Sequence, residues 1–93
     1  MKNGLMLISD ERHRQILKKG WTQEHDNEHT HCEMASAALS YIRFAHTTSR
    51  QPIPGCWPWD TKWWKPSDDP IRNLTKAGAL IAAEIDRLQR LKA

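Results

Sequence analysis

The stretch PIRNLTKAGALIAAEIDRL, residues 70–88, predicts the longest helix of this chain and thereby its fold. Asp69 can cap the helix, and Pro70 stands at the first helical position, where its missing amide hydrogen costs nothing. Large apolar residues and one glycine then recur at steps of three and four, which is nearly a heptad repeat. They are Ile71, Leu74, Gly78, Ile81, Ile85 and Leu88. We expect this row to be the apolar face of the helix, with charged residues on the other face.

The glycine and the apolar row both predict close packing partners. Gly78 in the middle of a helix costs about 1 kcal/mol relative to alanine, so we expect another helix or a tryptophan to approach it. The row could instead pair two copies of the chain, because a domain of 93 residues gains stability by burying a partner's apolar stripe. A homo-oligomer is therefore one expected assembly.

An earlier helix is indicated by SDERHRQILKKG, residues 9–20. Ser9 is a good N-cap, acidic residues follow it, two lysines end the stretch, and Gly20 can cap the C-terminus. These signals predict a helix from about residue 10 to about residue 19. Residues 1–8 are expected to be flexible or to form a short extended segment.

The sharpest helix start is THCE, residues 30–33. Thr30 can cap the helix while Glu33 reaches back to the amide of the cap. An apolar face follows at helical spacing, and we expect the helix to run to about residue 46. The residues of that face are Ala35, Ala38, Leu39, Ile42 and Ala45. Small polar residues and prolines then predict a loop over residues 47–56.

These elements together predict a mainly α protein, a single small domain over residues 1–93 with about three helices and an irregular Trp/Pro-rich segment before the last helix. No apolar run approaches the ~20 residues that a membrane-spanning helix needs. The N-terminus lacks a signal-peptide pattern and the two cysteines are expected to stay reduced, so we expect a cytoplasmic protein. The net charge of +3 is scattered, which disfavours non-specific duplex binding but suits a small phosphate-bearing ligand.

Four of the five tryptophans stand in GCWPWDTKWWKP, residues 55–66. Asp60 can cap a single helical turn, TKWW, and Pro66 ends it. Relative to that cap, Trp59 and Trp64 hold the two positions of a hydrophobic staple. We therefore expect these two tryptophans to stabilise the turn.

Trp57 and Trp63 have no such local partner, so we expect them either in the core or against a ligand, whose base could stack on their faces. Lys65 follows them directly, and Arg72 and Lys76 lie four residues apart on the first turns of the last helix. Like charges so placed repel mildly, and a helix N-terminus attracts anions. The basic residues therefore suit a phosphate or carboxylate, although a solvated helix face is the more common explanation of such a pair.

Histidines and acids gather in EHDNEHTHCE, residues 24–33. His25, Asp26 and His29 carry atoms that bind metals, and a histidine followed by an aspartate occurs in metal-dependent phosphohydrolases. Nothing in the spacing selects the remaining ligands of such a site. A polar turn or a cluster that contacts a ligand are the other interpretations, and we predict no bound metal or cofactor.

The segments ERHRQILKKGWTQEHDNEH, WPWDTKWWKP and KAGALIAAEIDRL, with the alanine-bearing helix between them, resemble a family of short proteins encoded by tailed bacteriophages and prophages, usually without assigned function. The resemblance covers about residues 10–90. It implies an accessory gene that works in the cytoplasm of an infected or lysogenic bacterium. RQILKKGWTQEHD also bears a fainter likeness to the RyR domain.

The residue types favour binding over catalysis. We predict a protein that binds a nucleotide or a nucleotide-derived immune signal, in the manner of an anti-defence sponge. The expected contact residues are Trp21, His25, Asp26, His29, Trp57, Trp63, Lys65, Arg72 and Lys76. One alternative is a metal-dependent nucleotide hydrolase that uses His25, Asp26 and His29, and another is a module whose tryptophans bind a host protein.

Overall fold

The computed structural model describes residues 1–46 and 53–92, and this part of the chain is 67% helix without a strand. Its elements are α1 (Gly4–Lys19), α2 (Gln23–Asn27), α3 (Glu33–Arg43), the 3-10 turn η1 (Thr61–Trp63) and α4 (Pro70–Lys92). The predicted mainly α fold class is confirmed, with α2 as an additional short helix. None of the described helices is long and apolar enough to cross a membrane.

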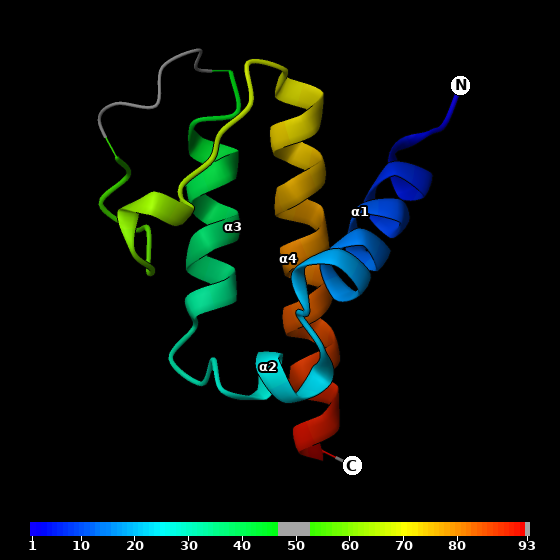
Figure 1. The fold of residues 1–93 in the computed structure, drawn as a ribbon, viewed down its shortest axis with the longest axis vertical. Coiled ribbons are helices and arrows are strands. Elements are labelled where there is room, and N and C mark those ends of the chain that lie inside the picture. Colours follow the sequence, from blue (N-terminus) through cyan, green and yellow to red (C-terminus); the bar gives the residue numbers. More distant parts are fainter. Residues whose placement is uncertain (47–52, 93) are drawn as a thin grey trace.

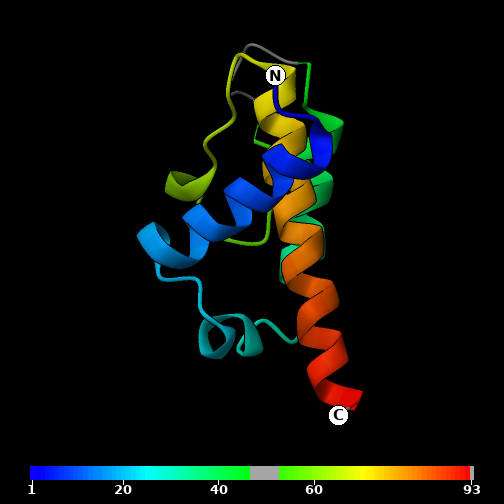
Figure 2. The ribbon, with the colours of Figure 1, turned by 90° about the vertical axis from the view of Figure 1, so that its right-hand side faces the viewer.

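α4 is the central element of the fold. α3 lies antiparallel along one side of α4, α1 crosses the other side at a wide angle, and α2 lies beside the C-terminal half (Figure 1). The irregular chain before α4 runs past α3 and carries η1. In Figure 2, η1 and the C-terminal end of α1 lie on the same side of the α3–α4 pair. Segments far apart in the sequence are thereby placed to form one site.

The start of α4 follows the prediction. The Asp69 carboxylate accepts a hydrogen bond from an amide of the first turn at 3.0 Å, and Pro70 is the first helical residue. Asn73, which is fully buried, donates to the carbonyls of Ala45 and Ser67 at 2.9 and 2.8 Å. It also accepts from the Ser67 amide at 2.7 Å. This one side chain ties the end of the α3 segment to the start of α4.

α1 begins at Gly4, so the prediction of a start near residue 10 was wrong. The Asn3 side chain caps the helix, accepting a hydrogen bond at 3.0 Å, and Ser9 lies within it. Residues 4–8 are therefore helical, not flexible or extended. The predicted end is confirmed, because Gly20 adopts the left-handed conformation with φ 70°.

α3 begins at Glu33, so Thr30 is not its cap. Cys32 holds the cap position in the left-handed conformation, φ 63°, without a side-chain hydrogen bond to the helix. Glu33 does reach back along the chain, but to the amide of His31. The helix ends at Arg43, earlier than predicted.

The buried faces of α3 and α4 differ from the prediction, because small residues mark them. The core comprises Met34, Ala37, Ala38, Tyr41, Trp64, Ala77, Leu80 and Ala83. The predicted apolar row of α4 instead faces solvent: Ile71, Leu74, Ile81, Ile85 and Leu88 are 42–61% exposed. On α3, Leu39 and Ile42 are 45% exposed and Ala35 is exposed too. Alanines let two helix backbones approach closely, so the bulky residues lie outside.

Gly78 lies where another helix approaches, as predicted. A β-carbon at this position would be 2.5 Å from Cδ1 of Ile8 on α1. One turn further along α1, the Glu11 carboxylate pairs with the Arg72 guanidinium of α4 at 2.7 Å. Close backbone approach and an ion pair together fix how α1 crosses α4.

The tryptophan segment forms the predicted turn, while residues 47–52 of the predicted loop lie outside the described part of the chain. Asp60 caps η1 through its carboxylate at 3.0 Å. Trp64 follows the turn in an extended conformation and is buried in the core. The predicted staple of Trp59 and Trp64 is modified, because both rings contact Trp57. The centroid of the Trp57 ring lies 5.4 Å from that of Trp59 and 5.1 Å from that of Trp64.

Candidate ligand-binding site

A pocket of about 500 Å³ lies on the side of the α3–α4 pair that carries η1. We call it the aromatic pocket, because five Trp or Tyr side chains and two histidines are among the residues that line it. The residues that line the pocket belong to α1, α3 and α4, to α2 and the chain on either side of it, and to residues 57–65. Its volume falls within the roughly 300–1,000 Å³ of typical small-molecule sites.

Four aromatic rings at one end of the aromatic pocket form a closed circuit, in which each ring contacts two of the others. Trp21 stacks on His25 with centroids 5.9 Å apart and nearly parallel planes, and His25 meets His29 edge-on at 4.8 Å. His29 contacts Trp59 at 5.3 Å, and Trp59 returns to Trp21 at 6.2 Å. The short helix α2 creates this circuit, since it brings residues before, within and after it to one side.

Two further tryptophans extend the aromatic surface. Trp57 packs edge-on against Tyr41 at 5.7 Å, and its indole N–H donates to the Asp60 carbonyl at 3.1 Å. Trp63 is 50% exposed and has the Lys65 ammonium 5.6 Å from its ring centroid. Trp57 is therefore held in place by the fold, whereas Trp63 is free to meet a ligand at the edge of the pocket.

Glu11 is the buried anion of the pocket wall. Its side chain, 2% exposed, accepts two hydrogen bonds from Arg14 at 2.8 Å each and pairs with Arg72 at 2.7 Å. Burial would raise the pKa of Glu11, but the bonds and charges of the two guanidinium groups outweigh it and lower the pKa from 4.5 to about 2. A guanidinium has five N–H donors, so Arg14 retains donors for a ligand.

Lys76 presents a partly desolvated ammonium group. Its Nζ donates to the Lys65 carbonyl at 2.7 Å and lies 5.4 Å from the centroid of the Tyr41 ring. Burial, followed by repulsion from Arg72, lowers the pKa of Lys76 from 10.5 to about 8. The group is protonated at pH 7, and an anion at this position would restore the solvation that it lacks.

Three buried polar atoms of the pocket wall have no hydrogen-bond partner within the described chain. They are Oε1 of Gln15, Nε2 of His29 and Nε1 of Trp59. Buried polar groups are nearly always bonded, and each exception calls for an explanation. A ligand with both donor and acceptor groups would supply the missing bonds.

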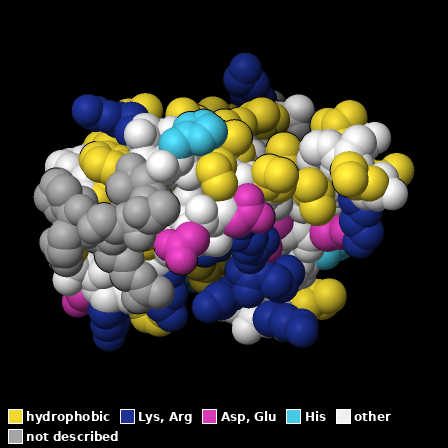
Figure 3. Space-filling view, turned by 90° about the horizontal axis from the view of Figure 1, so that it is seen from above, with side chains coloured by type: hydrophobic (Ala, Val, Ile, Leu, Met, Phe, Trp, Pro, Cys, Tyr) yellow, Lys and Arg dark blue, Asp and Glu magenta, His cyan; other side chains and the backbone are white. Residues whose placement is uncertain are grey.

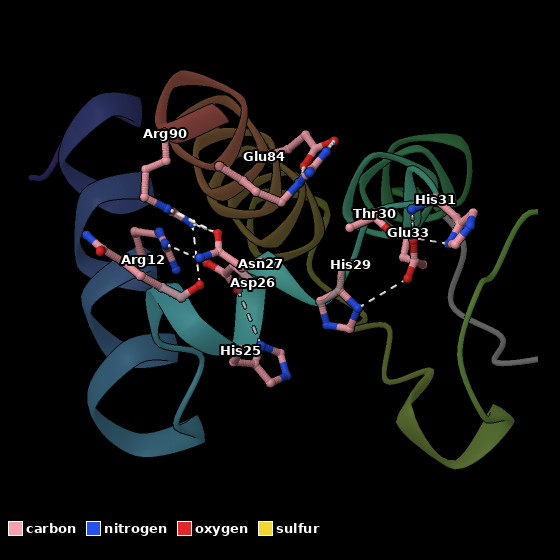
Figure 4. Close-up of polar contacts among 12 residues, drawn as sticks. Arg12, His25, Asp26, Asn27, His29, Thr30, His31, Glu33, Glu84 and Arg90 are labelled. Carbon is pink, nitrogen blue, oxygen red and sulfur yellow. Dashed lines mark hydrogen bonds and ion pairs between the residues drawn. The ribbon is translucent and has the colours of Figure 1, made fainter. Parts of the chain in front are cut away.

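The histidines and acids of residues 25–33 contact one another and neighbouring side chains (Figure 4). Asp26 is 1% exposed and pairs with Arg12 at 2.9 Å, while the Nδ1 atom of His25 lies 3.3 Å from the other Asp26 oxygen. His29 Nδ1 lies 3.4 Å from Glu33. Over residues 1–46 and 53–92, no three His, Cys, Asp or Glu side chains are grouped as a metal site requires.

The structure brings most of the predicted contact residues to one place. Those that line the aromatic pocket are Trp21, His25, His29, Trp57, Trp63, Lys65 and Lys76. Asp26 and Arg72 do not line the pocket. Asp26 forms an ion pair with Arg12, and Arg72 forms one with the lining residue Glu11. Their effect on a ligand is therefore indirect.

Several residues of the wall were not predicted. α1 contributes Glu11, Arg14, Gln15 and Lys19, and other segments contribute Tyr41, Trp59 and Leu80. A signal for α1 exists in the sequence, because Glu11, Gln15 and Lys19 recur at steps of four and so share a helix face. Trp59 was assigned to the staple instead.

Comparisons of the chain with protein-family models, with curated proteins and with solved structures find no match.

Proposed function

We propose that this protein binds a small aromatic anion of the nucleotide class in the aromatic pocket. The observation that carries the proposal is the convergence of an aromatic wall with four basic side chains around one volume of about 500 Å³. Such a volume suits a nucleotide, and concave, largely apolar sites with a few placed polar groups are the usual form of small-molecule sites.

The aromatic wall favours a ligand that contains a flat ring. Stacking of a base on an aromatic side chain contributes about 1–3 kcal/mol. Trp21 and Trp59 meet with their planes inclined by 55°, so they form two sides of a corner rather than one continuous face. A single base can therefore lie on one indole and meet the edge of the other.

The charges favour an anionic ligand. Arg14, Lys19, Lys65 and Lys76 line the pocket. Of the two acids there, Glu11 is already neutralised by Arg14 and Arg72. Charge-assisted hydrogen bonds to phosphate are about twice as strong as neutral ones. A phosphate close to Lys76 would gain such a bond and raise the pKa of the lysine.

The unpartnered polar atoms favour a base over a simple aromatic ring. Gln15 offers an acceptor and Trp59 offers a donor. His29 offers an acceptor at Nε2 if its Nδ1 proton bonds Glu33. A nucleobase edge carries donors and acceptors side by side, whereas an unsubstituted aromatic acid carries neither on its ring.

The phage resemblance extends the proposal to a biological role. A small binding protein made in an infected bacterium would act by sequestering a nucleotide, including a nucleotide-derived signal of bacterial immunity. Sequestration needs affinity without turnover, so the same ligand should be recovered intact from the complex.

Titration of tryptophan fluorescence with mononucleotides, cyclic dinucleotides and ADP-ribose tests the proposal. We expect a saturable change for at least one nucleotide, with weaker responses to adenosine, which lacks phosphate, and to ribose 5-phosphate, which lacks the base. Lys76→Met should weaken binding by about 10-fold to 100-fold, the equivalent of one charged hydrogen bond. A flat response to the whole panel refutes the proposal.

Lys62→Met is the matched control for Lys76→Met. Both lysines have their ammonium 5.4 Å from an aromatic centroid, but only Lys76 lines the pocket. The control should keep the affinity of the unmodified protein. Chromatography of the ligand after incubation, with and without Mn²⁺, separates binding from the hydrolase alternative, since hydrolysis would consume the nucleotide.

A further inference from the structure

The side of α4 that faces away from the aromatic pocket carries several exposed large apolar residues. Five exposed residues form a row along α4: Ile71, Leu74, Ile81, Ile85 and Leu88. On the neighbouring helix α3, Leu39 and Ile42 are also exposed. We call these seven residues the apolar stripe. Figure 3 shows hydrophobic side chains gathered along one edge of the molecule.

The spacing of the α4 row is that of a helix-pairing surface. With Gly78 included, its members follow at alternating steps of three and four, the repeat by which two helices bury a common seam. The repeat is sustained over five turns of the described helix Pro70–Lys92. Intramolecular packing covers the row only at Gly78, which Ile8 of α1 contacts, and the large apolar residues on either side of Gly78 stay exposed.

The α4 part of the apolar stripe also carries little charge. Of the exposed residues of α4 from Ile71 to Leu88, only Asp86 is charged. At 100° per residue, Asp86 lies more than about 100° from the middle of the row. Depletion of charge is the compositional mark of interface centres. In a chain of net charge +3, a neutral face is also the one on which two copies can meet without repulsion.

The size of the apolar stripe matches one half of a specific interface. At exposures of 42–61%, its seven residues present roughly 600 Å². A standard interface buries about 800 Å² per partner, and the rim around an apolar centre supplies the remainder. The stripe is therefore at the upper limit of what a monomer usually leaves uncovered.

We propose that two copies of this chain pair through the apolar stripe. A two-fold axis places the same surface on itself, so that the α3–α4 pairs of both copies form a four-helix arrangement. Lys76 and Leu80, the α4 residues of the aromatic pocket, lie about 165° and about 125° around the helix from the middle of the row. The dimer consequently leaves both pockets open.

Sedimentation velocity across the micromolar range tests this pairing. The unmodified chain should sediment as a species of twice 10.8 kDa. Ile81→Lys should weaken dimerisation at least about a hundredfold, because its ammonium would be buried without a partner. The matched control is Leu17→Lys on α1, an 81% exposed leucine outside the stripe, and it should stay dimeric. Circular dichroism confirms that each variant is helical.

Two results would overturn the pairing. One is an unmodified chain that stays monomeric at every concentration, in which case the stripe contacts a different protein. The other is an Ile81→Lys variant that is folded and still dimeric. If Ile81→Lys does not fold, Ile85→Gln takes its place with the same expectation. The ligand titration is independent, since pocket and stripe lie on different sides of α4.

Discussion

Glu11→Gln should lower the free energy of unfolding by about 2–3 kcal/mol at pH 7. The change keeps the volume of the side chain but removes the charge that holds Arg14 and Arg72. A pKa lowered from 4.5 to about 2 corresponds to about 3 kcal/mol of interaction with the ionised carboxylate. Both arginine side chains are 36% exposed, so water recovers part of the loss.

The pH dependence gives this prediction a second readout. Because the pKa of Glu11 is depressed, its contribution is complete above about pH 4.5 and is lost as the pH falls towards 2. The stability difference between the unmodified chain and Glu11→Gln should therefore shrink over that range. Urea unfolding followed by circular dichroism at several pH values measures it.

Asp10→Asn provides the control for this series. Asp10 is the preceding residue of α1, and its pair with Lys2 is exposed on both sides. Exposed pairs contribute about 0–1 kcal/mol, so we expect a loss below about 0.5 kcal/mol. A Glu11→Gln variant as stable as this control, or a stability gap that does not change with pH, would refute the role given to Glu11.

Three other perturbations have defined outcomes. Ligand affinity should fall as the pH rises through about 8, where Lys76 loses its proton. The affinity of Lys76→Met should not fall over this range, and equal pH profiles of the two proteins would contradict the role given to Lys76. Gly78→Ala should lower the free energy of unfolding by roughly 1–2 kcal/mol, because the new β-carbon meets Ile8. In an Ile8→Ala background the same change should raise it by up to about 1 kcal/mol. Thermal unfolding of the unmodified chain, the two single variants and the double variant measures both effects. Asn73→Ala should cost roughly 2–3 kcal/mol in urea unfolding, since backbone groups of Ser67 lose their partner, and a loss under about 0.5 kcal/mol would contradict that.

Three helix ends could be predicted from a cap and a partner close in sequence, whereas the same kind of signal at Thr30 and Glu33 misplaced the start of α3. Asp69, Asp60 and Gly20 all hold the predicted positions, because their hydrogen bonds involve residues two to five positions away. The start of α1 could not be predicted in this way. Asn3 and Ser9 are both good caps, and a contact distant in sequence, Ile8 against Gly78, accompanies the longer helix.

The faces of the helices could not be predicted from the spacing of large apolar residues. That rule assumes that bulky side chains fill the core, whereas α3 and α4 meet through alanines such as Ala38 and Ala77. Small residues give a weak hydrophobic signal but allow the closest packing. The regular row of Ile and Leu on α4 was the stronger pattern, and it lies on the exposed face.

The tryptophan-rich half of the candidate site could be predicted, whereas the α1 half could not. Trp57, Trp63 and Lys65 are close in sequence, so their common location follows from one turn. Glu11 and Gln15 reach the same pocket only because α1 crosses α4. Gly78 indicates a close approach, but the local sequence does not say which helix makes it or at what angle. Residue types therefore predict the chemistry of the pocket, whereas its geometry depends on contacts that are distant in sequence.

The indole N–H resonances of the five tryptophans provide the most direct test of the aromatic pocket. On addition of a nucleotide to ¹⁵N-labelled protein, the resonances of Trp21, Trp57, Trp59 and Trp63, which line the pocket, should shift. Trp59 should shift most, because its buried N–H has no partner, and the core residue Trp64 should shift least. If no nucleotide of the panel moves these four resonances, or if Trp64 moves as far as Trp59, the assignment of this pocket as the binding site is wrong.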